Sequence, residues 1–167
     1  MRRMTIWIAG MVVLSAGPLQ AECLQALTVK FVESALRDRF DIIHTATGVF
    51  VTGVSIDLRG SAGALVFDTE EGGAGTEVFQ PFRPDAGIEA AEIEDGARSI
   101  ELTLQDLSAG QRTGFTIDVD DQREQSDLGQ IRVTGGELAG AGVVFSLADD
   151  TEVSAVFDAN NRAKACT

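Results

Sequence analysis

Residues 98–105, with the sequence RSIELTLQ, indicate the fold class of this chain because hydrophobic side chains recur at every second position. These positions are Ile100, Leu102 and Leu104, and polar residues stand between them. A half-buried antiparallel β-strand shows this period of two, whereas an amphipathic helix has a period of about 3.6. An Asp-Gly turn signal at residues 95–96 precedes the segment. We therefore predict a strand over residues 98–105.

A second alternating segment, residues 115–120 with the sequence FTIDVD, follows a short connection at residues 106–110. Its hydrophobic positions are Phe115, Ile117 and Val119. Two alternating segments joined by a short turn commonly form a hairpin. We therefore predict that residues 98–105 pair with residues 115–120.

The same alternation recurs along most of the chain. Further strands are expected at residues 39–44, 54–58, 64–67, 143–147 and 153–157, with a last strand leading to Cys166. A turn at residues 148–150 would make a hairpin of the two segments beside it. Residues 24–36 fit a helical face as well as a strand, and their β-branched context favours the strand. The glycine-rich segments 72–75 and 135–142 should be turns or bulges.

Short strands of this number, about eight or nine, predict an all-β fold, an immunoglobulin-like antiparallel β-sandwich. A single closed sheet is the structural alternative. The length suits one domain with a real hydrophobic core better than two.

The N-terminus has the pattern of a secretion signal. Arg2 and Arg3 precede a mostly apolar stretch at residues 4–16, and Ala21 supplies a small residue before Glu22. The apolar stretch is shorter than the roughly 20 residues that span a bilayer. We expect a cleaved signal peptide over residues 1–21 and a single β-sandwich domain over residues 22–167. The product would be periplasmic or extracellular, without membrane insertion, and Glu22 before the first cysteine argues against a lipid anchor.

The chain has two cysteines, Cys23 and Cys166, near the two ends of the expected mature protein. A structural disulfide persists outside the cytoplasm, where no thiol pool reduces it. Catalytic dithiols usually have the spacing Cys-x-x-Cys, which is absent here. We therefore predict a disulfide that brings the first and last strands together, with their Cα atoms within about 7 Å of one another.

The chain is acidic, with 26 Asp and Glu against 13 Lys and Arg. Such a surface repels nucleic acid and anionic lipid headgroups, so a nucleic-acid partner is not expected. The acidic residues can instead bind cations, bind basic partners or keep the protein in solution. The expected partner is an unidentified protein or cell-surface component.

The strongest candidate for a metal site is the run Asp118-Val119-Asp120-Asp121. In a strand Asp118 and Asp120 share one face roughly 7 Å apart, so a bound cation would relieve their repulsion. Calcium, which takes six to eight oxygen ligands, suits Asp118, Asp120 and Asp121 and is the one expected cofactor. The spacing does not match an EF-hand loop. A second acidic run, residues 68–71, also departs from that loop, and both runs can alternatively be solvated loops.

Enzyme signatures are weak. His44 is the sole histidine and the chain lacks a Gly-x-Ser-x-Gly elbow. The sequence therefore offers few of the residues that a nucleophilic triad or a zinc site requires. A lone histidine of this kind is usually a surface or packing residue. Carboxylates are numerous enough for a glycosidase, but after signal removal phenylalanine is the only aromatic residue available for stacking on sugars. We therefore expect no enzymatic activity, with a carboxylate-based hydrolase as the alternative.

Three segments carry a family resemblance: residues 65–68 continuing to 78–82, residues 115–121, and residues 136–141. They resemble short exported proteins of alphaproteobacteria labelled "aggregation factor core". The resemblance implies an extracytoplasmic, non-enzymatic domain of adhesion-like type, and it transfers no binding residues. The expected function is thus a secreted binding or structural module stabilised by calcium. An assembly subunit that pairs through an edge strand is a further alternative.

Overall fold

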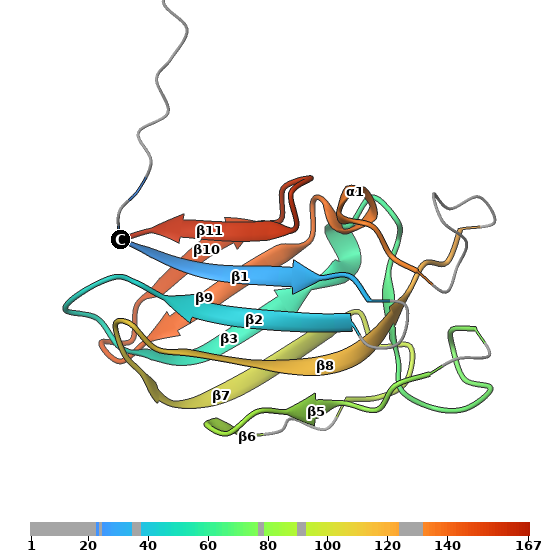
Figure 1. Ribbon diagram of the computed structural model, residues 1–167, viewed down its shortest axis with the longest axis horizontal. Coiled ribbons are helices and arrows are strands. Elements are labelled where there is room, and N and C mark those ends of the chain that lie inside the picture. The colour runs from blue at the N-terminus through green and yellow to red at the C-terminus, as the bar shows by residue number, and fades with distance from the viewer. Residues whose placement is uncertain (1–22, 24, 35–37, 77–78, 90–92, 124–131) are drawn as a thin grey trace, which may run out of the picture.

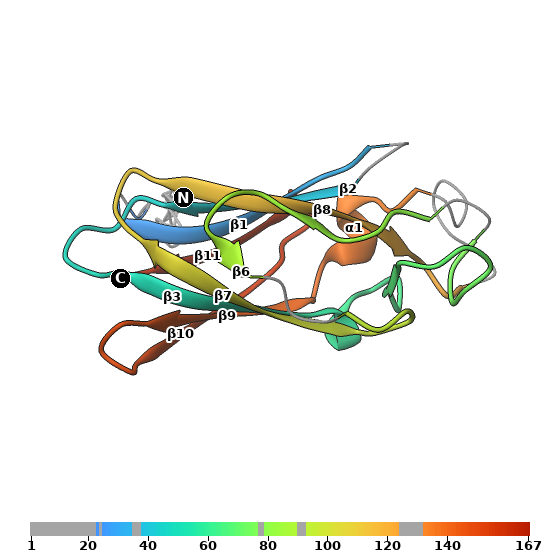
Figure 2. The ribbon, with the colours of Figure 1, turned by 90° about the horizontal axis from the view of Figure 1, so that it is seen from below.

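The alternating segments form strands of two antiparallel sheets in the computed structural model, which describes residues 23, 25–34, 38–76, 79–89, 93–123 and 132–167. One sheet has the order β11-β1-β2-β8-β4, with β5 also paired to β8, and the other has the order β10-β9-β3-β7-β6. Figure 2 shows the sheets as two layers, with β1, β2 and β8 in one and β3, β7 and β9 in the other. The predicted all-β class is confirmed.

Most strands lie where the alternating sequence pattern predicts them (Figure 1). The first sheet contains β1 (Ala26–Val32), β2 (Asp38–His44), β4 (Val66–Asp68), β5 (Arg83–Pro84), β8 (Arg112–Asp120) and β11 (Arg162–Cys166). The second contains β3 (Val51–Asp57), β6 (Ile88–Glu89), β7 (Ser99–Leu107), β9 (Gly142–Leu147) and β10 (Glu152–Val156). A 3-10 turn, η1 (Leu58–Gly60), and a four-residue helix, α1 (Gly135–Leu138), complete the described elements.

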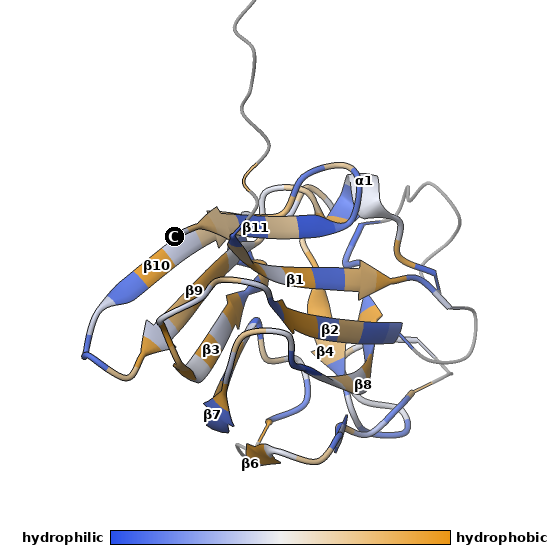
Figure 3. Ribbon diagram, turned by 60° about the vertical axis from the view of Figure 1, so that its left-hand side comes forward, coloured by the Kyte–Doolittle hydropathy of each residue, from blue (hydrophilic) through white to orange (hydrophobic). Residues whose placement is uncertain are grey.

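One hydrophobic core lies between the two sheets. Phe40 of β2 and Phe115 of β8 are cross-strand partners whose stacked rings have centroids 5.1 Å apart. Phe145 of the opposite sheet is fully buried in the same cluster of side chains. Figure 3 shows hydrophobic and polar residues alternating along several strands, as a sheet with one buried face requires. In β7 the alternation of exposed and buried residues follows the sequence pattern.

The predicted pairing of residues 98–105 with residues 115–120 is wrong. β7 pairs with β3 and β6, whereas β8 pairs with β2, β4 and β5. The connection after β7 therefore carries the chain from one sheet to the other. Alternation shows which face of a strand is buried, but it does not show which strand is its partner. Two strands paired in a hairpin and two strands facing each other across the core have the same alternating pattern.

The strand count also needs correction, because the described residues form eleven strands rather than eight or nine. The two that the sequence pattern missed, β5 and β6, have two residues each and are too short to show alternation. The segment at residues 135–142 is only partly a turn, since it begins with α1. In the capping box of this helix, the Thr134 hydroxyl accepts from the Glu137 amide and the Glu137 carboxylate accepts from the Thr134 amide.

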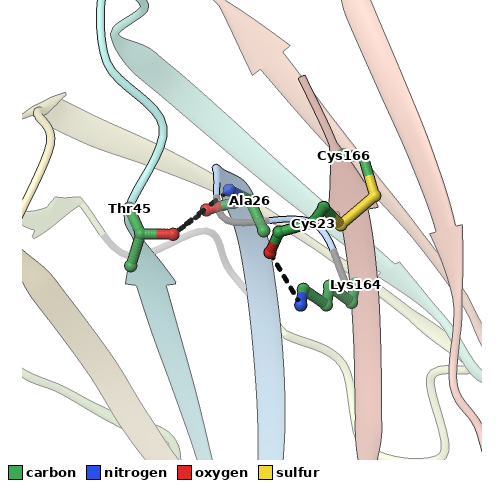
Figure 4. Close-up of a disulfide and its surroundings, with 5 residues drawn as sticks. All are labelled: Cys23, Ala26, Thr45, Lys164 and Cys166. Atoms are coloured by element: carbon green, nitrogen blue, oxygen red, sulfur yellow. Dashed lines mark hydrogen bonds between the residues drawn. A yellow bond between two sulfur atoms is a disulfide. The ribbon is translucent and has the colours of Figure 1, made fainter. Parts of the chain in front are cut away.

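Other expectations are confirmed. The described part of residues 24–36 contains β1 and no helix, and β9 and β10 form the predicted hairpin around residues 148–151. The first and last strands, β1 and β11, pair along their length, with Ala26 opposite Cys166. The predicted disulfide joins Cys23 to Cys166 with their Cα atoms 5.8 Å apart (Figure 4). The Lys164 ammonium donates to the Cys23 carbonyl beside it at 3.1 Å.

The predicted signal peptide at residues 1–21 lies outside the described residues. Within the described part of the chain, no helix has the length and apolar character needed to cross a membrane.

Candidate functional site

The two acidic runs that the sequence shows separately come together where β4 pairs with β8. Asp68, the last residue of β4, is the cross-strand partner of Asp118, and Val66 is the partner of Asp120. Figure 3 shows β4 and β8 side by side at one edge of their sheet. Partners directly opposite each other in an antiparallel pair project from the same face. Asp68, Asp118 and Asp120 therefore share one face of the sheet.

This face is not the core face, because Phe67 and Val119, which alternate with the aspartates, are the residues that enter the core. The aspartates are nevertheless buried. Asp68 and Asp120 are 0% exposed and Asp118 is 7% exposed. A loop at residues 69–76 lies over them, and in it Gly75 comes so near that an added Cβ atom would clash with carboxylate oxygens of both Asp68 and Asp120.

A fourth aspartate, Asp95, holds this covering loop in place. Its carboxylate accepts hydrogen bonds from the backbone amides of Thr69 at 2.8 Å, Glu70 at 3.3 Å and Ala74 at 2.5 Å. Burial acts to raise the pKa of Asp95, but the three amide donors outweigh it and the pKa is lowered. At its far end the loop is tied to Asp120, which accepts from the amide and the hydroxyl of Thr76.

Two further aspartates complete what we call the acidic cluster. This cluster consists of Asp38, Asp68, Asp118, Asp120 and Asp121, all buried. Asp38 is the cross-strand partner of the core residue Ile117, so it lies on the other face of the sheet from Asp68, Asp118 and Asp120. Asp38 begins β2, and its carboxylate accepts from the Ser34 amide at 3.3 Å. Asp121 follows β8 directly, and one of its oxygens accepts from the Arg123 amide at 3.0 Å.

Several carboxylate oxygens of the cluster are buried without a hydrogen-bond donor. In the described residues six buried side-chain atoms lack a partner, and four of them are in the cluster: both oxygens of Asp68, Oδ1 of Asp120 and Oδ2 of Asp121. Each buried polar atom without a partner costs about 1–3 kcal/mol, and more when it is charged. The protein keeps these oxygens together although their burial opposes folding.

The pKa values follow from this crowding. Burial, then the neighbouring carboxylates of Asp95 and Asp120, raises the pKa of Asp68 to about 7. Burial, then Asp120 and Asp68, raises the pKa of Asp118 to about 7. Asp38 reaches about 8 through burial and, more weakly, through Asp118 and Asp120. Burial also raises the pKa of Asp120, although the two donors of Thr76 oppose the rise.

Basic side chains do not neutralise the cluster in the described residues. The ion pairs there join Arg39 to Asp41 and Asp85, and Arg59 to Asp57. As far as the described residues go, protons or a bound cation are what can compensate these carboxylates near neutral pH. The donors are all oxygen atoms, which is the ligand chemistry of calcium.

The predicted metal ligands Asp118, Asp120 and Asp121 are thus placed in one buried region, with Asp120 closest to a second carboxylate, Asp68. The described residues do not contain three or more Asp, Glu, His or Cys side chains already gathered as an ion-holding group. The carboxylates that do come together are those of Asp68 and Asp120, which meet beside Gly75.

The sequence interpretation missed Asp38 and Asp95. Asp95 was read only as part of a turn, and Asp38 begins a strand where a polar residue is unremarkable. The interpretation also left Asp68 in a separate acidic run, although Asp68 directly follows the alternating residues Leu65 and Phe67 with no basic residue nearby in the sequence.

His44 is a packing residue. Its ring is fully buried at the end of β2 opposite to Asp38, and Nε2 lies 3.1 Å from the carbonyl oxygen of Val49. The largest surface hollow described, with a volume of about 630 Å³, lies over the five-stranded sheet and is lined by residues of β3, β7, β9 and β10. Neither this hollow nor three smaller ones of about 230–250 Å³ is lined by His44 or by the acidic cluster.

Comparison with models of known protein families finds no match to this chain, and comparison with curated protein sequences finds none either.

Proposed function

We propose that the protein is an exported, non-enzymatic β-sandwich module with a binding or structural role, and that calcium bound at the acidic cluster stabilises it. The observation that carries the calcium part is the set of four buried, unpartnered carboxylate oxygens on Asp68, Asp120 and Asp121. Asp68 and Asp120 would supply the first ligands, because their oxygens already converge. Asp118, directly opposite Asp68, and Asp121 would supply the others.

Near neutral pH, bound calcium would compensate the negative charges of the cluster more fully than protonation alone. The raised pKa values mean that protons leave Asp68 and Asp118 near neutral pH, which would bring buried negative charges together. A divalent cation compensates such charges and accepts the oxygen lone pairs that no donor reaches. Known extracellular calcium sites of modest affinity bind with dissociation constants of about 0.1–1 mM.

A binding or structural role agrees with the site better than hydrolysis does. A two-carboxylate hydrolase needs its acid and base to reach a substrate. The converging carboxylates of Asp68 and Asp120 are 0% exposed and line none of the four described hollows. Their burial supports a stabilising role for the cluster.

Export is supported by the disulfide, which is compatible with an oxidising compartment, and by the resemblance to exported adhesion-like proteins. Two stacked antiparallel sheets support an immunoglobulin-like architecture. One difference from antibody domains concerns the disulfide. Here it joins the segment just before β1 to the end of the neighbouring strand β11 in the same sheet, whereas the antibody disulfide connects the two sheets.

Thermal melting with calcium and with chelator tests the calcium part. Calcium at about 100 times its dissociation constant adds about 2.7 kcal/mol to the free energy of unfolding, so Tm should rise by roughly 5–10 °C. Asp68→Asn should remove most of this shift, because it removes a converging ligand. The matched control is Asp106→Asn, at an exposed residue of β7. A Tm that is the same with calcium and with chelator would refute the calcium site.

A further inference from the structure

Three basic side chains gather on the outer face of the six-stranded sheet, where β1 and β11 pair. Ala163 and Ala165 of β11 enter the core, so Arg162 and Lys164, which alternate with them, point outward. Lys30 of β1 is the cross-strand partner of Arg162 and shares its face. Side chains directly opposite each other have Cβ atoms about 5 Å apart, and diagonal neighbours about 7–8 Å. The three long side chains can therefore reach one bound group.

These three residues line one surface hollow of about 230 Å³, which we call the basic hollow. Thr28, the cross-strand partner of Lys164, also lines it, as does Cys23 of the disulfide. Figure 4 shows Lys164 beside the disulfide, where its ammonium donates to the Cys23 carbonyl. Among the described residues, neither Asp nor Glu lines the basic hollow. It is thus a positively charged surface in a chain whose formal net charge is −13.

The cations of the basic hollow lack anionic partners in the part of the chain that the structure describes. Every ion pair found there involves Arg39 or Arg59. The Lys164 ammonium makes one hydrogen bond, to the Cys23 carbonyl, and keeps two further N–H donors. The basic hollow therefore offers charged donors that can bind an anion.

Two carboxylates lie near these cations, but both already accept hydrogen bonds. Asp41 is opposite Lys30 on β2, and its Oδ1 accepts from the Arg39 guanidinium at 2.7 Å. Oδ1 of Asp158 accepts from the Arg162 amide at 3.1 Å. Lys30 and Arg162 are themselves like charges placed directly opposite each other, which destabilises a sheet. An anion bound between them would relieve this repulsion.

The number of cations and the charge of the whole chain indicate the class of anion. Three separate cations match the three terminal oxygens of a sulfate or phosphate ester better than the two oxygens of a carboxylate. The net charge of the chain repels nucleic acid and anionic bilayers, so it favours a single anionic group on an uncharged carrier. The Thr28 hydroxyl beside the cations can bond to a sugar hydroxyl.

We propose that the basic hollow binds a sulfate or phosphate ester group carried by an otherwise neutral sugar. Lys30, Arg162 and Lys164 donate to the ester oxygens, and Thr28 contacts the sugar. The Cys23 carbonyl, fixed by the disulfide, holds Lys164 in position. This inference rests on the proposed binding role, and it gives that role a surface and a class of ligand.

Calorimetric titration with glucose 6-sulfate and with glucose 6-phosphate tests the proposal, and glucose is the uncharged control. We expect saturable binding of an ester and none of glucose. Lys30→Gln and Arg162→Gln should each weaken binding at least about tenfold, because each removes a charge-assisted hydrogen bond. Arg162→Lys, which keeps the charge, should retain most of the binding. The matched control is Arg83→Gln, at an exposed arginine of β5 outside the hollow, which should bind as the parent does.

Thermal melting verifies that each variant is folded. No binding of either ester by the parent, or equal binding by the folded Lys30→Gln and Arg162→Gln variants, would overturn the proposal. Sodium sulfate that binds as tightly as glucose 6-sulfate would overturn the contact with the sugar.

Two other occupants of the basic hollow give different results. Sedimentation with phosphatidylglycerol vesicles that Arg162→Gln abolishes would overturn the proposal in favour of an anionic bilayer. A dimer in native mass spectrometry that the same variant dissociates would overturn it in favour of a carboxylate from a second copy.

The basic hollow lies at the β11 edge of the six-stranded sheet, whereas Asp68, Asp118 and Asp120 lie toward its β4 edge. Ester binding is therefore expected in chelator as well as in calcium. A protein that binds the ester but does not respond to calcium would refute only the calcium site, and the reverse result would refute only the basic hollow.

Discussion

Asp68 and Asp118 are cross-strand partners, so two buried carboxylates face each other where β4 meets β8. Cross-strand pairs of like charge destabilise a sheet. Asp118→Asn should therefore raise the stability of the calcium-free protein, by roughly 1–3 kcal/mol at pH 8, because an amide carries no charge and can donate to Asp68. Urea unfolding in chelator measures this change.

The same variant should lose part of its response to calcium, because it removes one of the proposed ligands. Asp106→Asn, at an exposed aspartate outside the cluster, is the control for a general effect of removing one negative charge. A calcium-free Asp118→Asn protein that is less stable than the parent would show that the carboxylate has a favourable partner and would contradict this prediction.

The calcium-free protein should become less stable as the pH rises from about 4 to about 8. Asp38, Asp68 and Asp118 have folded-state pKa values of about 8, 7 and 7, all above the ordinary value of 3.8. The unfolded chain therefore loses these protons first, and the stabilisation present at low pH disappears as the pH passes through the folded-state values. Calcium should flatten the dependence, because it compensates the ionised groups.

Urea unfolding at pH 5 and at pH 8, each with calcium and with chelator, separates these effects. Below pH 4 the trend should reverse, since Asp57, Asp95 and Asp149 have lowered pKa values and lose their favourable contacts on protonation. Greater calcium-free stability at pH 8 than at pH 5 would mean that the cluster does not behave as a set of buried acids.

Much of the fold could be predicted from the sequence because alternation is a local property. The buried positions of β7 and β8 follow directly from their sequence, and the two cysteines predicted the pairing of β1 with β11. The partner of β7 could not be predicted in this way. Whether it pairs with β8 or with β3 depends on which sheet the chain enters after residue 107, and both arrangements bury the same side chains.

Only part of the candidate site could be predicted from the sequence, for a related reason. The period of two placed Asp118 and Asp120 on one face, but it also suggested that this face would be solvated. Burial comes from the loop at residues 69–76, whose path depends on hydrogen bonds to Asp95, far away in the sequence. Contacts between distant residues of this kind leave no periodic signal, so Asp68 and Asp118 read as two separate acidic runs.

Gly75→Ala should destabilise the protein and also weaken calcium binding. An added Cβ would meet carboxylate oxygens of both Asp68 and Asp120, and overpacking of this kind typically costs about 1–3 kcal/mol. The matched control is Gly142→Ala, where a Cβ would have only ordinary contacts and should cost little. Calorimetric calcium titration and thermal melting of both variants measure the two effects. Equal behaviour of the two variants would mean that the loop does not hold Gly75 against the cluster.

Removal of the disulfide should lower stability without abolishing the fold. The bond joins residues 143 positions apart, and closing a loop of this size stabilises a protein by about 4–5 kcal/mol in the chain-entropy model, with measured values often smaller. The ladder between β1 and β11 and the core residues Ala163 and Ala165 remain in the variant Cys23→Ser/Cys166→Ser, so it should still unfold cooperatively. Its Tm should be lower than that of the parent and indifferent to reductant, whereas reductant should lower the Tm of the parent toward the same value. Hydrogen exchange should increase most in β11, which has β1 as its main partner strand. A parent protein whose Tm does not change when the disulfide is shown by mass to be reduced would mean that the pairing of β1 with β11 holds the termini together without the covalent bond.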